Sequence, residues 1–106
     1  MDEDQIFEAE AIRNTSEHTS GQSDTGEFTA KTILIDNGLD QQVTFQLQGS
    51  RDGVLWIDVG GTFNIAASTN DYETVSDYFP FYQIKATCTV APTTGDLDVW
   101  IIKSKG

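Results

Sequence analysis

Few residues of this chain could do chemistry. His18 is the only histidine and Cys88 the only cysteine among the 106 residues, so a cysteine–histidine nucleophile would need both. His18 stands in a polar tract, whereas Cys88 continues the inward phase of an alternating run with Ile84 and Ala86. The sequence therefore predicts a buried, inert thiol, no internal disulfide and no enzymatic activity.

Carboxylates are abundant, so a metal site needs separate consideration. Asp96 and Asp98 stand two apart in the last predicted strand and share a face, and Asp36 and Asp40 flank an Asn-Gly turn. Such oxygens suit calcium. The favoured interpretation is that these carboxylates are solvated or cap turns. We therefore expect no cofactor and no metal, with calcium at Asp96 and Asp98 as the alternative.

The charge balance limits the kind of partner. Six Lys and Arg residues face 17 Asp and Glu residues, giving a formal charge of −11. This field repels nucleic acid and anionic membrane surfaces, and we expect neither as a partner. The acidity fits either solubility or life in high salt, where repulsion is screened. The start "MDEDQIFEAEA" lacks the basic and apolar regions of a secretory signal, which favours a chain made in the cytoplasm.

The first quarter of the chain differs from the rest. In "QIFEAEAI" Phe7, Ala9 and Ala11 alternate with glutamates, which predicts a short strand, with a helix as the alternative. Residues 14–26 are rich in Ser, Thr and Gly and cannot bury enough apolar surface to order by themselves. We expect residues 1–27 to form an acidic N-terminal arm or first strand with a flexible loop, and residues 28–106 to form the main domain.

That main domain has the period of β-structure. Residues 41–48 and 81–90 alternate strictly, and residues 54–59 form a continuous apolar run typical of a central strand. Asn37-Gly38 and Asp52-Gly53 suit turns that need positive φ. About seven short strands, with no helical period, predict an all-β antiparallel β-sandwich, Ig-like or jelly-roll-like.

The final strand suggests an interaction surface. Leu97, Val99 and Ile101 alternate as a core face, so Trp100 and Ile102 must point outward. An outward Trp and Ile imply a cover, either the N-terminal arm or another subunit. We predict interface roles for Ile6, Phe7, Ile12, Trp100 and Ile102. The run "SDYFPFYQ" could stack on a sugar, although core packing is the default for such aromatics.

Two stretches, "VTFQLQGSRDGVLWIDVGG" and "DYFPFYQIKATCTVAPTTGDLDVWII", carry a family resemblance. Over about residues 28–103 the chain resembles small β-sandwich virion proteins of tailed phages and tailed archaeal viruses. These show a Ser-x-Asp-Gly-x-x-Trp hairpin, an aromatic-Pro-aromatic strand entry and a Pro-Thr-x-Gly turn. The matching residues are Ser50, Asp52, Gly53, Trp56, Pro80, Tyr82, Pro92 and Gly95.

The resemblance implies a non-enzymatic virion protein, assembled in the host cytoplasm as a capsid decoration or cement protein, a turret component or a tail part. It implies a major capsid protein or other virion subunits as partners, a homo-oligomer, and a halophilic archaeal host for so acidic a chain. The same hairpin resembles discoidin-like carbohydrate-binding domains, so a host-receptor or sugar-binding module is the alternative. In that hairpin Asp52-Gly53 is expected to make the turn and Trp56 to anchor the core.

Overall fold

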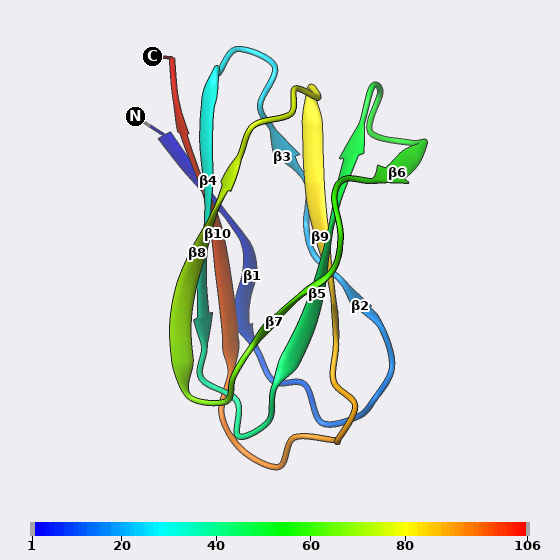
Figure 1. The fold of residues 1–106 in the computed structure, drawn as a ribbon, viewed down its shortest axis with the longest axis vertical. Coiled ribbons are helices and arrows are strands. Elements are labelled where there is room, and N and C mark those ends of the chain that lie inside the picture. Colours follow the sequence, from blue (N-terminus) through cyan, green and yellow to red (C-terminus); the bar gives the residue numbers. More distant parts are fainter. Residues whose placement is uncertain (1, 106) are drawn as a thin grey trace.

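The computed structural model describes residues 2–105, which form two antiparallel sheets packed face to face (Figure 1). The predicted all-β sandwich is confirmed, although with more strands than the seven expected. Within the described residues the strands are β1 Asp2–Glu10, β2 His18–Thr19, β3 Ser23–Asp24, β4 Ala30–Asn37, β5 Val43–Ser50, β6 Trp56–Asp58, β7 Phe63–Ile65, β8 Thr69–Val75, β9 Phe81–Thr87 and β10 Leu97–Ser104. No helix in residues 2–105 is long and apolar enough to cross a membrane.

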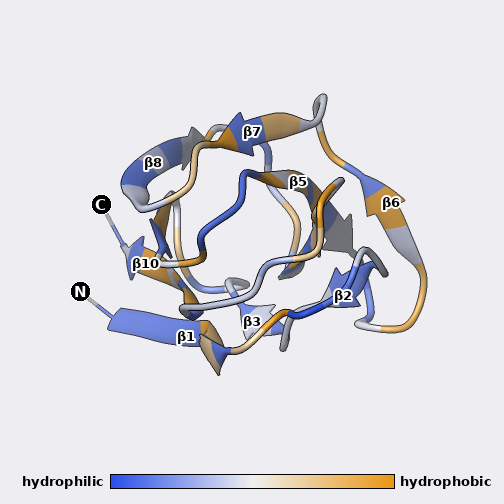
Figure 2. Cartoon of the chain, turned by 90° about the horizontal axis from the view of Figure 1, so that it is seen from below, coloured by the Kyte–Doolittle hydropathy of each residue, from blue (hydrophilic) through white to orange (hydrophobic). Residues whose placement is uncertain are grey.

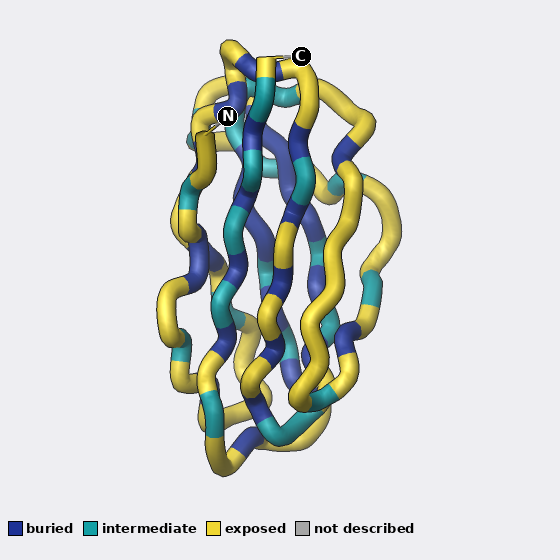
Figure 3. Tube along the Cα trace, turned by 90° about the vertical axis from the view of Figure 1, so that its left-hand side faces the viewer, coloured by how far each residue is buried: buried dark blue, intermediate teal, exposed yellow. Residues whose placement is uncertain are grey.

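One sheet has four strands in the order β1-β10-β4-β8. Its inner face follows from period two: Ile33 and Ile35 of β4 and Val99 and Ile101 of β10 are buried, while the residues between them face out. Figure 3 shows this alternation along the sheet, and shows β8 as an almost continuously exposed edge.

The second sheet is built around β9 and β5. Strands β2 and β3 pair with one side of β9, and β6 and β7 pair with successive parts of β5. Val43, Phe45 and Leu47 enter the core as predicted, opposite Ile84 and Ala86. Val90 was expected to continue the inward phase of β9, but β9 ends at Thr87 and Val90 is exposed.

Of the two alternatives predicted for the start of the chain, an arm or a first strand, the structure shows a first strand that is part of the sandwich. β1 pairs with β10 along its length, from Asp2 opposite Lys103 to Glu10 opposite Leu97. A register shift between Gln5 and Phe7 places Ile6 and Phe7, adjacent in sequence, both in the core. The predicted face of Phe7, Ala9 and Ala11 therefore fails, because Ala9 and Ala11 are exposed.

The polar tract after β1 is also ordered by the sandwich. Its short strands β2 and β3 pair with β9, and the Ser20 hydroxyl accepts a hydrogen bond of 2.8 Å from the Ile84 backbone N–H. Thr25 donates from its hydroxyl to the Phe79 carbonyl at 2.7 Å. Backbone pairing to an existing sheet replaces the apolar burial that this tract lacks, so the expectation of a flexible loop fails here too.

The turn after β4 differs from the expected one. Gly38 does not adopt positive φ; instead the fully buried Asn37 side chain organises the turn. Its amide donates to the carbonyls of Gln41, Ile65 and Ala66 at 3.1–3.2 Å, and its Oδ1 accepts from Leu39 N–H. Four backbone groups at the lower end of the sandwich are thus satisfied by one side chain.

Candidate functional site

The outer face of the four-stranded sheet carries an apolar row. The strand register places Trp100 opposite Leu34 and Leu34 opposite Tyr72, so these three side chains lie side by side across β10, β4 and β8. Tyr72 is 63% exposed and Leu34 38% exposed, and Trp100 is half-buried. With the half-buried Ile102, two residues further along β10, they form what we call the outer row.

Two of the five predicted interface residues face outward in the structure, and the other three do not. Trp100 and Ile102 point outward from β10, as predicted, and Gln5 and Glu3 of β1 lie opposite them. Ile6, Phe7 and Ile12 are at most 6% exposed and belong to the chain's own core, so they cannot meet a neighbour. The bulge in β1 turns both Ile6 and Phe7 inward, which the simple alternation did not anticipate.

Sequence reasoning did not single out Leu34, and named Tyr72 only as one of many aromatics. A signal for Leu34 was present, because Ile33 and Ile35 facing the core require Leu34 to face away. Tyr72 joins the row only through the pairing of β8 with β4, which is a tertiary feature.

Two carboxylates lie beside the outer row, one cross-strand pair away from Trp100 and Leu34 on the same face. Asp98 of β10 lies directly opposite Asp36 of β4, and like charges so placed repel one another. The Asp98 carboxylate accepts hydrogen bonds from Gln5 Nε2 at 2.9 Å and from Ala9 N–H at 2.8 Å. It thereby fixes the irregular part of β1, where Ala9 has φ of 46°.

A second candidate calcium ligand, Asp40, is likewise engaged in hydrogen bonds within the chain. Asp40 accepts hydrogen bonds from the N–H and hydroxyl of Thr93, and these bonds hold the pKa of Asp40 below its ordinary value. Asp96 is exposed and precedes β10. Among residues 2–105, no three His, Cys, Asp or Glu side chains converge as a metal-binding group.

The β5–β6 hairpin differs most from its sequence-based prediction. Instead of a central strand, residues 54–59 contain only the short edge strand β6, and the hairpin projects from the body at the upper right of Figure 1. Trp56 is half-buried and lies outside the core, so it does not anchor it. Val54, Leu55 and Ile57 are 81%, 69% and 50% exposed. We call these three residues the hairpin tip.

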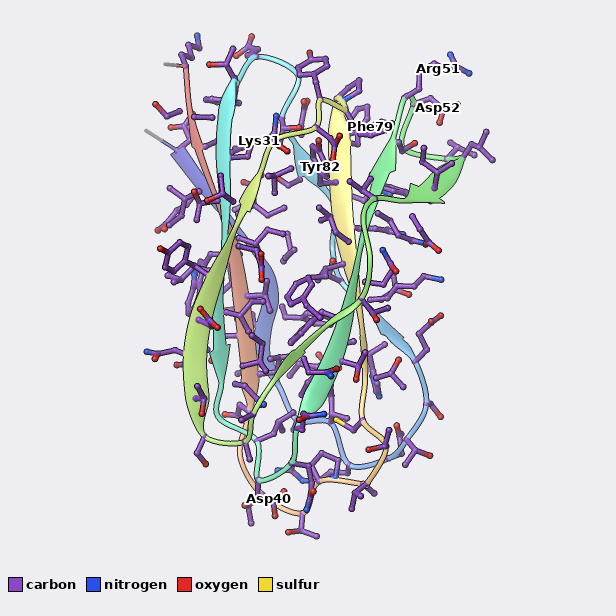
Figure 4. All side chains as sticks on the ribbon, in the orientation of Figure 1. Lys31, Asp40, Arg51, Asp52, Phe79 and Tyr82 are labelled. Carbon is purple, nitrogen blue, oxygen red and sulfur yellow. The ribbon has the colours of Figure 1, made fainter. Side chains whose placement is uncertain are left out.

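The turn that carries the tip is held by side-chain hydrogen bonds. Asp52 Oδ1 accepts from the N–H groups of Leu55 and Val54 at 3.0 and 2.9 Å, which lowers the pKa of the Asp52 carboxyl. Ser50 Oγ accepts from Gly53 N–H at 2.9 Å, and Gly53 has φ of 80°. The expected roles of Asp52 and Gly53 in the turn are therefore confirmed, and Figure 4 shows Asp52 and Arg51 at its end.

Cys88 and His18, the two residues considered as a catalytic pair, each have their own separate environment. Cys88 is a buried free thiol, and burial raises its pKa, so the reactive thiolate is disfavoured. His18 Nε2 lies 2.9 Å from Asn14 Oδ1, and its Nδ1 lies 3.8 Å from a Glu10 carboxylate oxygen.

The proposed sugar platform at residues 78–82 is not a free aromatic surface. Tyr82 is 1% exposed; burial raises its pKa to about 12, and its hydroxyl donates to the Asp77 carbonyl. The Phe79 ring packs edge-on against Tyr82 inside the upper end (Figure 4). Tyr78 remains exposed, with its hydroxyl bonded to the Gly26 carbonyl.

Comparison with known proteins adds information on the fold. No family model and no curated protein sequence matches this chain. Among solved structures, the PBSX exported protein XepA is similar at a TM-score of 0.76 and 13% identity, over 98% of this chain and 37% of XepA. The chain thus spans little more than a third of the length of XepA. PirA is similar at a TM-score of 0.52 and 12% identity, over 97% of this chain and 92% of PirA.

Proposed function

We propose that this chain is a non-enzymatic structural protein of a tailed virus, and that it decorates or cements the capsid by packing its outer row against a neighbouring virion subunit. The observation that carries the proposal is the outer row itself. Trp100, Leu34 and Tyr72 form a contiguous apolar strip on a sheet face that no part of residues 2–105 covers. An aromatic centre with a polar rim is the usual anatomy of a protein interface.

Two further observations support the viral assignment. XepA is an exported protein of the phage PBSX, and it shares the fold over nearly the whole of this chain. The Ser-x-Asp-Gly-x-x-Trp hairpin and the aromatic-Pro-aromatic entry resemble those of small virion proteins. We assign the adhesive role to the sheet face and not to residues 1–27, because Ile6, Phe7 and Ile12 are buried in the chain's own core. Repetition on a symmetric capsid would multiply modest single contacts.

The test is incorporation into particles. Trp100→Ser and Leu34→Ser remove outward apolar side chains while leaving the inner face intact. Both variants should still fold, by circular dichroism, but should fall at least about tenfold in copies per purified particle, measured by quantitative mass spectrometry. Val90→Ser is the matched control, because Val90 is equally apolar and 56% exposed outside the row. Absence of the unmodified protein from particles, or normal incorporation of both row variants, would refute the proposal.

The alternative of a sugar-binding module is supported by one feature of the same face. Tyr72 and Trp100 present two aromatic rings on either side of Leu34, and aromatic rings can stack on sugar rings. Binding of the free protein to a glycan array, lost in Trp100→Ala and kept in Val90→Ser, would favour this function over the structural one.

A further inference from the structure

The hairpin tip is an apolar surface that the proposed function leaves unexplained. Ile57 lies on the edge strand β6 and Val54 and Leu55 lie in the turn before it, so all three are exposed on the sheet that does not carry the outer row. Figure 2 shows apolar segments of the β6 region at the periphery of the molecule. The turn is held by Asp52, Ser50 and a hydrogen bond from Gln22 Nε2 to the Gly53 carbonyl. Since the tip is ordered before any contact, docking it would cost little conformational entropy.

The same molecule has a second unexplained feature, an open groove between the edges of the two sheets. It has a cavity volume of about 290 Å³. Its lining is mixed: both sheets contribute apolar side chains, namely Ile33, Leu47, Val59, Phe63 and Val75, and Thr62, Thr74 and Ser76 contribute hydroxyl groups. Glu73 and Asp77, both exposed, stand on its β8 side. We call this cavity the inter-sheet groove.

The tip and the groove are complementary in charge. Arg51 stands three residues before Val54; its side chain is 85% exposed and forms a local ion pair of 3.6 Å with Asp52. Arg51 is the most exposed of the ion-paired Lys and Arg side chains in residues 2–105, since Lys105, Lys85 and Lys103 are 70%, 29% and 8% exposed. The groove offers two carboxylates beside an apolar floor, so an apolar segment next to an exposed arginine matches it in both respects.

From this match we infer that the hairpin tip of one copy of the chain docks in the inter-sheet groove of a second copy. Leu55 and Val54 would enter the apolar floor, and Arg51 would pair with Glu73 or Asp77. Two copies related by a twofold axis would make the contact twice, whereas a head-to-tail arrangement would build a ring or a chain. The contact does not depend on the outer row, so it holds or fails independently of the proposed function.

Two copies of this chain carry the same negative net charge, so the salt concentration must be varied when their association is tested. Charges of −11 on each copy repel at low salt, and this long-range repulsion is screened as the Debye length falls from about 10 Å at 0.1 M to about 3 Å at 1 M. The unmodified protein should therefore show concentration-dependent association by sedimentation velocity. This association should be stronger at about 1 M than at about 0.1 M salt.

Four variants locate the contact. Leu55→Ser should weaken association about ten- to a hundredfold, the effect of losing one buried leucine side chain. Arg51→Glu should weaken association at the lower salt concentration, as should reversal of both groove acids, Glu73→Arg with Asp77→Arg. Combining Arg51→Glu with the two reversed acids should restore it, because the pair is re-formed with opposite polarity. Val90→Ser is the apolar control and should associate normally.

Several outcomes would overturn the inference. These are a monomer at every concentration and both salt levels, association that survives Leu55→Ser, or failure of the combined charge reversal to restore what Arg51→Glu removes. Binding of the monomer to neutral phosphatidylcholine vesicles, lost in Leu55→Ser, would assign the tip to a lipid surface instead. Because every substituted side chain is exposed, circular dichroism of each variant should match the unmodified protein.

Discussion

At the scale of single residues, a buried lysine ties the first strand to the last. Lys103 Nζ of β10 donates to Asp4 Oδ2 of β1 and to the Asp24 carbonyl, both at 2.8 Å, and lies 4.9 Å from the centre of the Phe28 ring. The Lys103 side chain is only 8% exposed, so this ammonium depends on Asp4 for its counter-charge. A lysine on the inner face of a strand is thereby stabilised inside the sandwich.

This pair makes stability depend on pH through Asp4. Burial raises the pKa of the Asp4 carboxyl, but the hydrogen bonds from Lys103 and Ser23 and the charge of Lys103 outweigh it. The pKa therefore lies below its ordinary value of 3.8. A carboxyl whose pKa is lowered on folding contributes stability that is present above the unfolded pKa and lost as the pH falls through the folded pKa.

We expect Asp4→Asn to unfold at lower urea concentration than the unmodified protein at neutral pH. The difference in free energy of unfolding should shrink as the pH falls below 3.8, because protonation then removes the same charge from the unmodified chain. Urea titrations at several pH values measure this. Asp96→Asn, at an exposed position, should cost less stability at neutral pH; a difference for Asp4→Asn that stays constant with pH would contradict the role of the Asp4–Lys103 pair.

At the scale of elements, two turns pack against each other at the lower end of the sandwich, near Asp40 in Figure 4. Gly38 N–H donates to the Asp96 carbonyl at 2.9 Å, and Asp40 N–H donates to the Thr94 carbonyl at 3.3 Å. Gly95 lies between them with φ of 90°, and a methyl group there would overlap the Gly38 carbonyl oxygen. Glycine is therefore required at position 95 by both backbone conformation and space.

Gly60 gives a matched comparison, because it also has positive φ, 70°, but no neighbouring atom within 4 Å of an added methyl group. Gly60→Ala should cost about 1–2 kcal/mol from backbone strain alone. Gly95→Ala should add about 1–3 kcal/mol of overpacking to the same strain. Thermal and urea unfolding would measure both; equal losses in the two variants would show that crowding at Gly95 relaxes without cost.

The elements also show how far local pattern could predict this fold. The strict alternation of residues 41–48 correctly gave the inner face of β5, because period two and burial on one side agree there. The central strand predicted for residues 54–59 is wrong: a continuous apolar run is typical of a strand buried on both faces, but Val54, Leu55 and Ile57 are exposed. Whether such a run is central or projects at an edge depends on which strands pair beside it, and β6 has a partner on one side only.

At the scale of the whole molecule, β1 is an integral part of the sandwich. It brings Ile6 and Phe7 into the core and leads directly to Ile12, and all three are nearly inaccessible. Burial of three such side chains contributes about 5–9 kcal/mol, at about 1.5–3 kcal/mol each. That is comparable to the total stability of a typical domain, about 5–15 kcal/mol.

Deleting residues 2–13 should therefore leave an unfolded or molten chain, not a folded sandwich that has lost its partner. Circular dichroism and thermal unfolding of the truncated and full-length chains would show this. A truncated chain that melts cooperatively at the same temperature would contradict the assignment of β1 to the core. Ile6→Ala alone should cost about 2–5 kcal/mol and serves as a milder test of the same packing.

The sequence by itself determined the fold class, the inward faces of β5, β9 and β10, the Asp52-Gly53 turn and the buried state of Cys88. These features depend on residue type and on a period of two, which act over a few neighbouring residues. Only the tertiary structure decided that β1 enters the core, that Tyr72 lies beside Leu34 and Trp100, and that the tip 54–57 projects while an apolar groove stays open. Such features depend on bulges, strand order and sheet edges, and these are set by pairing between segments far apart in the chain.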